Sequence, residues 1–220
     1  MVVKDVKDLC FSLLKEKLTP LGYKSNKKKQ AFTKINDLGF DQIRYGTVEY
    51  ANLKLYKVYF YIGIRIDEVE RIDNFAHKFH EEAFKSQSLT CNLNCGTLIG
   101  QEKLEFDLYT LQDVENAVET CWKIYQEFGV EHIKKCYDIN FLNTLWKTYG
   151  LLAKTNGMDI RDWLTVYGWY DKVLAIAYVA NKAAFPAFRI EFTDYLVNNR
   201  GMPENKLNEM NEYLDKIQHL

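Results

Sequence analysis

The sequence predicts an α+β protein in which an antiparallel sheet with flanking helices is followed by an all-helical C-terminal half. Several segments before residue 110 alternate apolar and polar residues, whereas only helical spacing is found beyond about residue 137. Strands that precede helices are typical of the α+β class, and the short turns between them indicate antiparallel pairing. We expect an α+β domain over residues 1–137. Residues 138–220 are expected to form a helical domain, or a helical extension packed on the sheet.

The chain is expected to begin with a helix and two short strands. Residues 2–18 carry apolar groups at helical spacing, and Thr19-Pro20 ends the helix because a residue that precedes proline avoids the α region. Residues 31–35 and 40–51 alternate as strands, with Gly46 interpreted as a bulge or a bend.

The clearest strand covers residues 55–67. One side of it carries Tyr56, Val58, Phe60, Ile62, Ile64 and Ile66. The other side carries Lys57, Tyr59, Tyr61, Gly63 and Arg65, and we call it the polar face.

A helix, two strands and a second helix are expected next. Residues 69–84 return to helical spacing, and residues 89–99 and 104–108 alternate. Thr110 is the predicted N-cap of the following helix, with Asp113 at the third helical position of a capping box. The inner stripe of this helix is predicted to be Val114, Ala117, Val118, Cys121, Tyr125 and Phe128.

Gly129 is expected to end that helix, and further helices follow it. The first begins at Asp138 as its cap. The others are expected near residues 159–180, with a kink at Gly168, over residues 185–198, and from Pro203 onward.

Composition excludes several classes of function. Lys+Arg 29 against Asp+Glu 30 leave a net charge of −1, which argues against broad binding of nucleic acid or anionic membranes. Five lysines between residues 24 and 34 are the one local excess, interpreted as a solvated loop. Charges interrupt the first 17 residues, and the longest apolar run, 173–180, is shorter than the roughly 20 residues that a membrane span needs. We therefore expect a cytoplasmic protein with no membrane partner and reduced cysteines.

The opening residues carry the one family resemblance. This segment resembles a bacterial family of uncharacterised domains at Leu18-Thr19-Pro20-Leu21-Gly22-Tyr23-Lys24, at the lysines that follow and at Phe32. Those domains begin with a helix, which is followed by the motif L-x-P-x-G-[FY]-K-K and by a strand that starts with Phe. Their later strands are similar to the segment Phe60-Tyr61-Ile62-Gly63-Ile64 of this chain. The resemblance covers the first third of the chain. It implies an α+β fold and a bacterial origin, and it assigns no activity to any residue.

A tetrahedral zinc site needs four ligands, a number that Cys91 and Cys95 supply together with His77 and His80 upstream. Both cysteines lie among leucines at strand spacing, so we interpret them as core residues, too far apart for a disulfide. No phosphate-binding, dinucleotide-binding or nucleophile-elbow motif is found, and we expect no metal, cofactor or catalytic residue.

Two weaker clusters are interpreted as structural. Asp73, His77 and Glu81 share one helix face, which is typical of a solvated face. His132 lies four residues before Cys136, which is weak support for an activated thiol.

The polar face is the strongest candidate for a binding site. The candidate residues are Arg44, Lys57, Tyr59, Tyr61, Arg65, Asp107 and Tyr109. Tyrosine and arginine are enriched at binding hot spots. Two interpretations remain open: the helical half covers this face through a wet, tyrosine-rich interface, or the face is open and binds a partner. An RNA-binding sheet, with Tyr59 and Tyr61 stacked on bases, is disfavoured by the net charge.

The leading hypothesis is a bacterial cytosolic module of the immunity or regulatory type that binds another protein without catalysis. The alternative is an enzyme whose site on the polar face binds a small anionic ligand. In that alternative Arg44 or Arg65 binds the anion, and Glu105 or Asp107 acts as the base.

Overall fold

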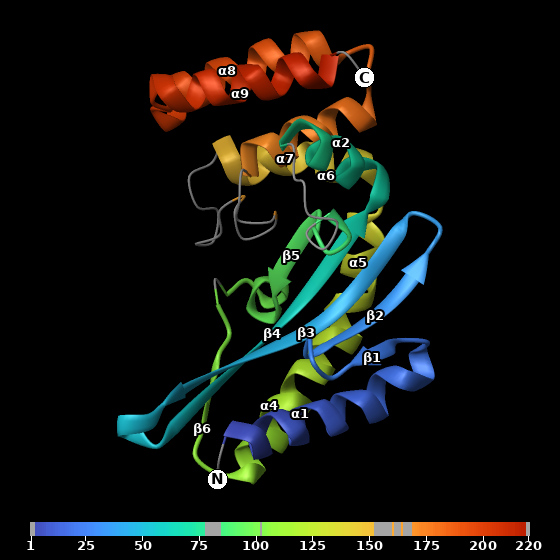
Figure 1. The fold of residues 1–220 in the computed structure, drawn as a ribbon, viewed down its shortest axis with the longest axis vertical. Helices are drawn as coiled ribbons and strands as arrows, with labels where there is room; N and C mark the ends of the chain where they lie inside the picture. The colour runs from blue at the N-terminus through green and yellow to red at the C-terminus, as the bar shows by residue number, and fades with distance from the viewer. Residues whose placement is uncertain are drawn as a thin grey trace.

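The computed structural model describes residues 3–77, 85–101, 103–151, 160, 164 and 169–218. It confirms the α+β class, with an antiparallel sheet in the N-terminal half and helices in the C-terminal half (Figure 1). Within the described part of the chain, no helix is long and apolar enough to cross a membrane.

The sheet follows chain order from β1 to β5, and β6 pairs with the opposite end of β4. All pairs are antiparallel. The strands are β1 (Lys24–Asn26), β2 (Ala31–Asn36), β3 (Gly39–Tyr50), β4 (Leu55–Ile66), β5 (Cys91–Asn94) and β6 (Phe106–Leu108). The turn η2 (Ala51–Leu53) joins β3 and β4 into the long hairpin that projects at the lower left of Figure 1. The short strand β1 was not expected, but the lysine-rich segment around it is exposed, as predicted.

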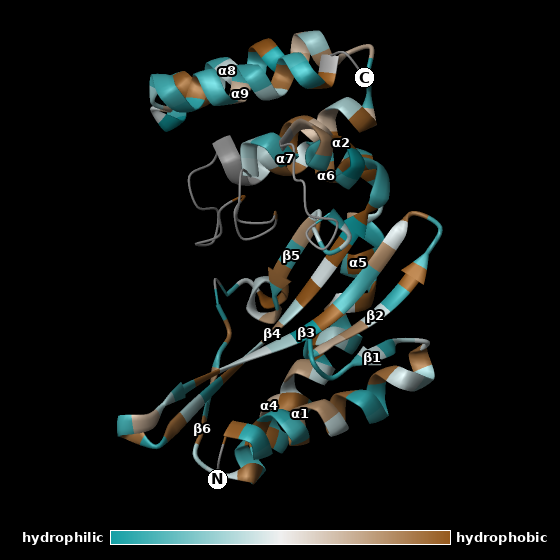
Figure 2. Ribbon diagram, viewed as in Figure 1, coloured by the Kyte–Doolittle hydropathy of each residue, from teal (hydrophilic) through white to brown (hydrophobic). Residues whose placement is uncertain are grey.

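The apolar side of β4 forms the floor of the core. Its alternating residues from Tyr56 to Ile66 are all buried, as the alternation predicted. Two helices, α1 (Val3–Leu18) and α4 (Leu111–Ile124), lie side by side on this floor, and both carry brown apolar residues among teal polar ones in Figure 2.

Local signals in the sequence set several element ends. Helix α1 passes into a single turn, η1 (Thr19–Leu21), and ends at Gly22, whose φ of 88° suits glycine. The Thr110–Asp113 capping box that opens α4 is present. Asp138 caps the next helix by accepting a hydrogen bond from the Asn140 backbone.

The strand expected over residues 89–99 is wrong beyond Asn94. The Asn94 side chain accepts hydrogen bonds from the backbone N–H of Gly96 at 2.8 Å and of Leu104 at 2.7 Å. These bonds turn the chain into a short helix, η3 (Cys95–Ile99), instead of letting it extend.

The helix end expected at Gly129 is also wrong. Helix α4 continues through a π-helical turn, η4 (Tyr125–Gly129), into α5 (Val130–Cys136). A Cβ at Gly129 would lie 3.2 Å from Ile62 Cδ1, so glycine lets this helix approach the sheet closely. Phe128 lies within this π-helical turn and is 39% exposed, so its expected place on the inner stripe is wrong.

The C-terminal helices stack beyond the end of the sheet at which β4 runs into α2 (Asp67–His77) (Figure 1). They are α6 (Ile139–Leu145), the π-helical turn η5 (Trp146–Leu151), α7 (Trp169–Ala180), α8 (Phe185–Arg200) and α9 (Glu204–Gln218). Much of the helix expected near residues 159–168, its kink at Gly168 included, lies outside the described residues.

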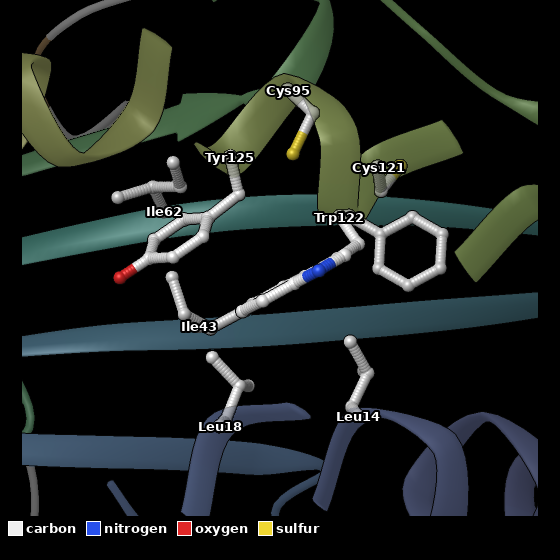
Figure 3. Close-up of a pocket in the computed structure, with 9 residues that line it drawn as sticks. Leu14, Leu18, Ile43, Ile62, Cys95, Cys121, Trp122 and Tyr125 are labelled. Carbon is white, nitrogen blue, oxygen red and sulfur yellow. The ribbon is translucent and has the colours of Figure 1, made fainter. Parts of the chain in front are cut away.

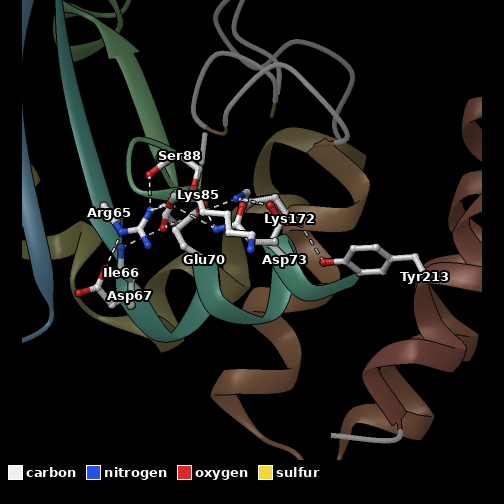
Figure 4. Close-up of polar contacts among 11 residues, drawn as sticks. Arg65, Ile66, Asp67, Glu70, Asp73, Lys85, Ser88, Lys172 and Tyr213 are labelled. Carbon is white, nitrogen blue, oxygen red and sulfur yellow. Dashed lines mark hydrogen bonds and ion pairs between the residues drawn. The ribbon is translucent and has the colours of Figure 1, made fainter. Parts of the chain in front are cut away.

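A buried charge cluster joins these helices to α2 (Figure 4). The Lys172 ammonium of α7 lies 2.6 Å from Glu70 Oε1 and 2.6 Å from Asp73 Oδ2. The Tyr213 hydroxyl of α9 donates to Asp73 at 3.0 Å, and the Thr90 hydroxyl donates to Glu70 at 2.9 Å. The interpretation of Asp73 on a solvated helix face is therefore wrong, because Asp73 is buried and paired with Lys172, which lies 99 residues away in the chain. The side chains of His77 and Glu81 lie outside the described residues.

We expect the substitution Lys172→Met to lower the free energy of unfolding by about 3–5 kcal/mol, because it leaves two buried carboxylates without their counter-ion. Urea titration followed by circular dichroism measures the change. Lys15→Met, at an exposed position of α1, serves as the control and should change stability by less than about 0.5 kcal/mol. Equal effects of the two substitutions would contradict this role of Lys172.

Candidate binding face of the sheet

The strand register assembles most of the predicted site on the polar face. Arg44 of β3 lies opposite Tyr61 of β4, and Lys57 lies opposite Asp107 of β6. Tyr59 lies between them on β4, and none of the residues Arg44, Lys57, Tyr59 and Tyr61 is fully buried. Tyr109 follows β6 and is 63% exposed.

The aromatic centre of this face depends on Gly46. Gly46 pairs directly with Tyr59 in an unbroken ladder, so the expected bulge or bend is wrong. A Cβ at Gly46 would lie 2.3 Å from Tyr59 Cε2, which shows that the ring lies directly over the glycine. The Tyr59 and Tyr61 rings meet edge to face, with their centroids 5.5 Å apart. Packing on the backbone therefore fixes the Tyr59 ring in place.

Three cations lie over three tyrosine rings of this face. Arg44 lies 6.0 Å from the centroid of Tyr61, Lys103 5.7 Å from Tyr59, and Lys57 6.0 Å from Tyr50. Sequence reasoning missed Tyr50 and Lys103. The alternation along residues 40–51 places Tyr50 on the same side as Arg44, whereas Lys103 lies in an irregular segment that carries no such signal.

The carboxylates of this face are paired with the two lysines. Lys57 lies 2.5 Å from Glu105 and 3.4 Å from Asp107, and Lys103 lies 2.7 Å from Glu105. Hydrogen bonds from Lys103 and Lys57 lower the pKa of Glu105 to about 2. Glu105 is therefore a poor general base at neutral pH.

Arg44 differs from these lysines because no carboxylate of the described residues pairs with it. One terminal nitrogen, Nη2, donates to the neutral Oδ1 of Asn92 at 2.6 Å. The Nε atom is buried and has no hydrogen-bond partner among the residues that the structure describes. Burial lowers the pKa of the Arg44 guanidinium, but an arginine stays protonated at neutral pH. The face thus holds a half-buried cation to which no described residue supplies a counter-ion.

Arg65 has a structural role, and its prediction as an anion-binding residue finds no support in the geometry. Its Nε lies 2.5 Å from Asp67, and Nη1 donates to the backbone oxygens of Lys85 at 2.6 Å and Ser88 at 3.0 Å. These bonds tie the end of β4 to the segment that precedes β5.

The described C-terminal helices α7, α8 and α9 do not lie over the polar face. They stack beyond the end of the sheet (Figure 1), while α1 and α4 occupy the opposite, apolar face. Of the two interpretations left open by the sequence, the described residues favour the open face.

The cysteines are buried in the core, as expected. Cys95 contacts Cys121, Cys91 contacts Cys136, and Cys136 Sγ lies 3.3 Å from His132 Nε2. The contact with Cys91 and burial raise the pKa of Cys136, and burial lowers that of His132 to about 4, so the pairing of His132 with Cys136 does not activate the thiol. No cluster with the ligands of a metal ion is found in the described ranges, and the side chains of the two histidines of the zinc hypothesis lie outside them.

Two hollows lie away from Arg44. The cavity between α1, α4 and the sheet has a volume of ≈ 20 Å³, enough for about one water molecule, and apolar side chains such as Leu14 and Ile43 line it (Figure 3). An open groove of ≈ 390 Å³ lies between β6 and α4. Of its carboxylates, Glu105 is paired with lysines and Asp113 forms part of the capping box of α4.

No family model, curated protein or solved structure matches this chain in the three comparisons made. The resemblance of the opening residues to a bacterial family therefore stays a prediction.

We expect Gly46→Ala to displace the Tyr59 ring and to lower the free energy of unfolding by about 1–3 kcal/mol through overpacking. In the Tyr59→Ala background the same substitution should cost less than half as much, because the clashing ring is absent. Urea titrations of the four proteins of this double-mutant cycle measure the coupling. Additive effects would show that the ring does not lie over Gly46.

His132 should make stability fall in mild acid. Its folded-state pKa of about 4 lies below the ordinary 6.5, so the unfolded chain takes up a proton first as the pH drops. The contribution of His132 to the free energy of unfolding is fully present above pH 6.5. It decreases by up to about 3 kcal/mol as the pH falls towards 4. The difference in unfolding free energy between the wild type and His132→Gln should shrink over that window. An NMR titration that finds a pKa near 6.5 for His132 would contradict the prediction.

Proposed function

We propose that the protein is a binding module that recognises another protein through the polar face of its sheet and catalyses no reaction. In this proposal it acts in a bacterial cytosol as a regulatory or immunity-type partner, and neither nucleic acid nor a membrane is its target.

One observation supports this proposal above the others: a row of tyrosines and cations, none of them fully buried, along one face of the sheet. Tyr50, Tyr59 and Tyr61 each lie under a cation, and Tyr109 is exposed beside them. From Arg44 to Tyr50 the row extends about 20 Å at the ordinary strand rise. That length suits a protein interface of standard size, in which tyrosine and arginine contribute much of the binding energy.

The enzyme alternative has less support. Arg44 offers an anion site, but Glu105 is held ionised by two lysines and its low pKa makes it a weak base. Asp107 is half exposed and shares Lys57 with Glu105, so it lies in solvent beside a lysine instead of in a buried site.

Affinity capture from a lysate of the native organism tests the proposal. The wild type should enrich a stoichiometric partner, and the double substitution Tyr59→Ala/Tyr61→Ala should reduce its recovery at least 10-fold, as expected for loss of hot-spot residues. Ile190→Ala, on the exposed outer side of α8, is the control and should leave recovery unchanged. Circular dichroism establishes that all variants fold. Equal recovery by the wild type and the double variant, or no enriched partner, would refute the proposal.

A further inference from the structure

The three cation–tyrosine pairs of the polar face differ in one respect. Lys57 and Lys103 share the carboxylate of Glu105, at 2.5 and 2.7 Å. Arg44 lies over Tyr61 in the same way, yet it forms no ion pair within the described residues. The face thus supplies a counter-ion for two of its three ring-bound cations.

The neighbours of Arg44 in the sheet do not balance its charge. Ala31 and Tyr61 lie directly opposite it on the adjacent strands, and the next residues across the sheet are Asn26 and Asn94. All four are neutral. A half-buried charge surrounded by neutral groups has lost part of its hydration without an ionic partner, which is unfavourable in the free protein.

The geometry of the guanidinium leaves an edge for a ligand. Its Nε is buried and one N–H of Nη2 is donated to Asn92, while Nη1 makes no hydrogen bond to the described residues. The N–H groups of Nη1 are thus left for a ligand, and the end edge of a planar guanidinium, formed by Nη1 and Nη2, matches the two oxygens of a carboxylate.

We propose that Arg44 is the specificity residue of the polar face and binds an aspartate or glutamate side chain of the partner protein. This inference rests on the proposed function, since it names the group that the partner presents. The partner carboxylate supplies to Arg44 the counter-ion that Glu105 supplies to the lysines, and the flanking tyrosines exclude water from the pair.

Substitutions of Arg44 test the inference with the captured partner. Arg44→Gln should reduce recovery of the partner at least 10-fold and Arg44→Lys less, because lysine keeps the charge but loses the bidentate geometry. Arg189→Gln, on α8, is the matched control and should have no effect. A water-soluble carbodiimide should couple position 44 of the Arg44→Lys variant to an aspartate or glutamate of the partner, and mass spectrometry identifies the linked residue.

The outcomes separate this inference from the proposed function. If Tyr59→Ala/Tyr61→Ala abolishes capture while Arg44→Gln captures as the wild type does, the inference is wrong and the binding module stands. Loss of capture after phosphatase treatment of the lysate would identify phosphate, not carboxylate, as the anion and overturn the inference. If Arg44→Gln destabilises the fold, the carbodiimide product decides, and a product without an acidic residue refutes the inference.

An NMR titration addresses Arg44 without any partner. Sodium acetate should shift the Nε–Hε signal of Arg44 saturably, whereas sodium chloride at equal ionic strength should not. Identical responses to the two salts would contradict a carboxylate site. A response to acetate combined with failed capture would support the carboxylate site at Arg44 but refute the protein partner.

Discussion

The buried pairing of Lys172 with Glu70 and Asp73 is the contact on which the arrangement of the two halves depends. Each of these ions would cost several kcal/mol to bury alone, so helix α7 can occupy its place only when its ammonium reaches both carboxylates. Thr90 extends the same network to the sheet, because its hydroxyl donates to Glu70 and accepts from the backbone of Ile66. The helices are thereby held at the end of the sheet, and none of the helices that the structure describes covers the polar face.

The exposed position of that face accounts for its composition. A sheet face covered by helices would carry apolar residues, as the opposite side of β4 does. The polar face instead carries tyrosines and cations that stabilise one another, and Gly46 provides the space that keeps Tyr59 in one orientation. Ordered aromatic groups lose little conformational entropy on binding, which makes such a surface suited to recognition.

Short-range patterns predicted the fold where they were strong. The alternation along β4 identified both of its faces, and Thr110 and Asp138 marked the starts of helices through their own side chains. Prediction failed where one side chain or one glycine changed the local path. Asn94 ends β5 by capping the next turn, and Gly129 lets the π-helical turn continue because it fits against the sheet. Neither effect has a periodic signature.

The sequence by itself determined which residues share a face, because side-chain direction follows from the period of a strand or helix. The alternation placed Tyr59 and Tyr61 on one face of their strand and made Arg44 of the preceding strand a candidate for the same face. Only the tertiary structure decided how each charge is satisfied, since counter-ions come from distant parts of the chain. Arg65 and Lys172 are held by partners that folding brings to them, while Arg44 meets only neutral groups among the described residues. Ion pairs form between residues that are close in space but distant in the chain, so local sequence patterns do not predict them.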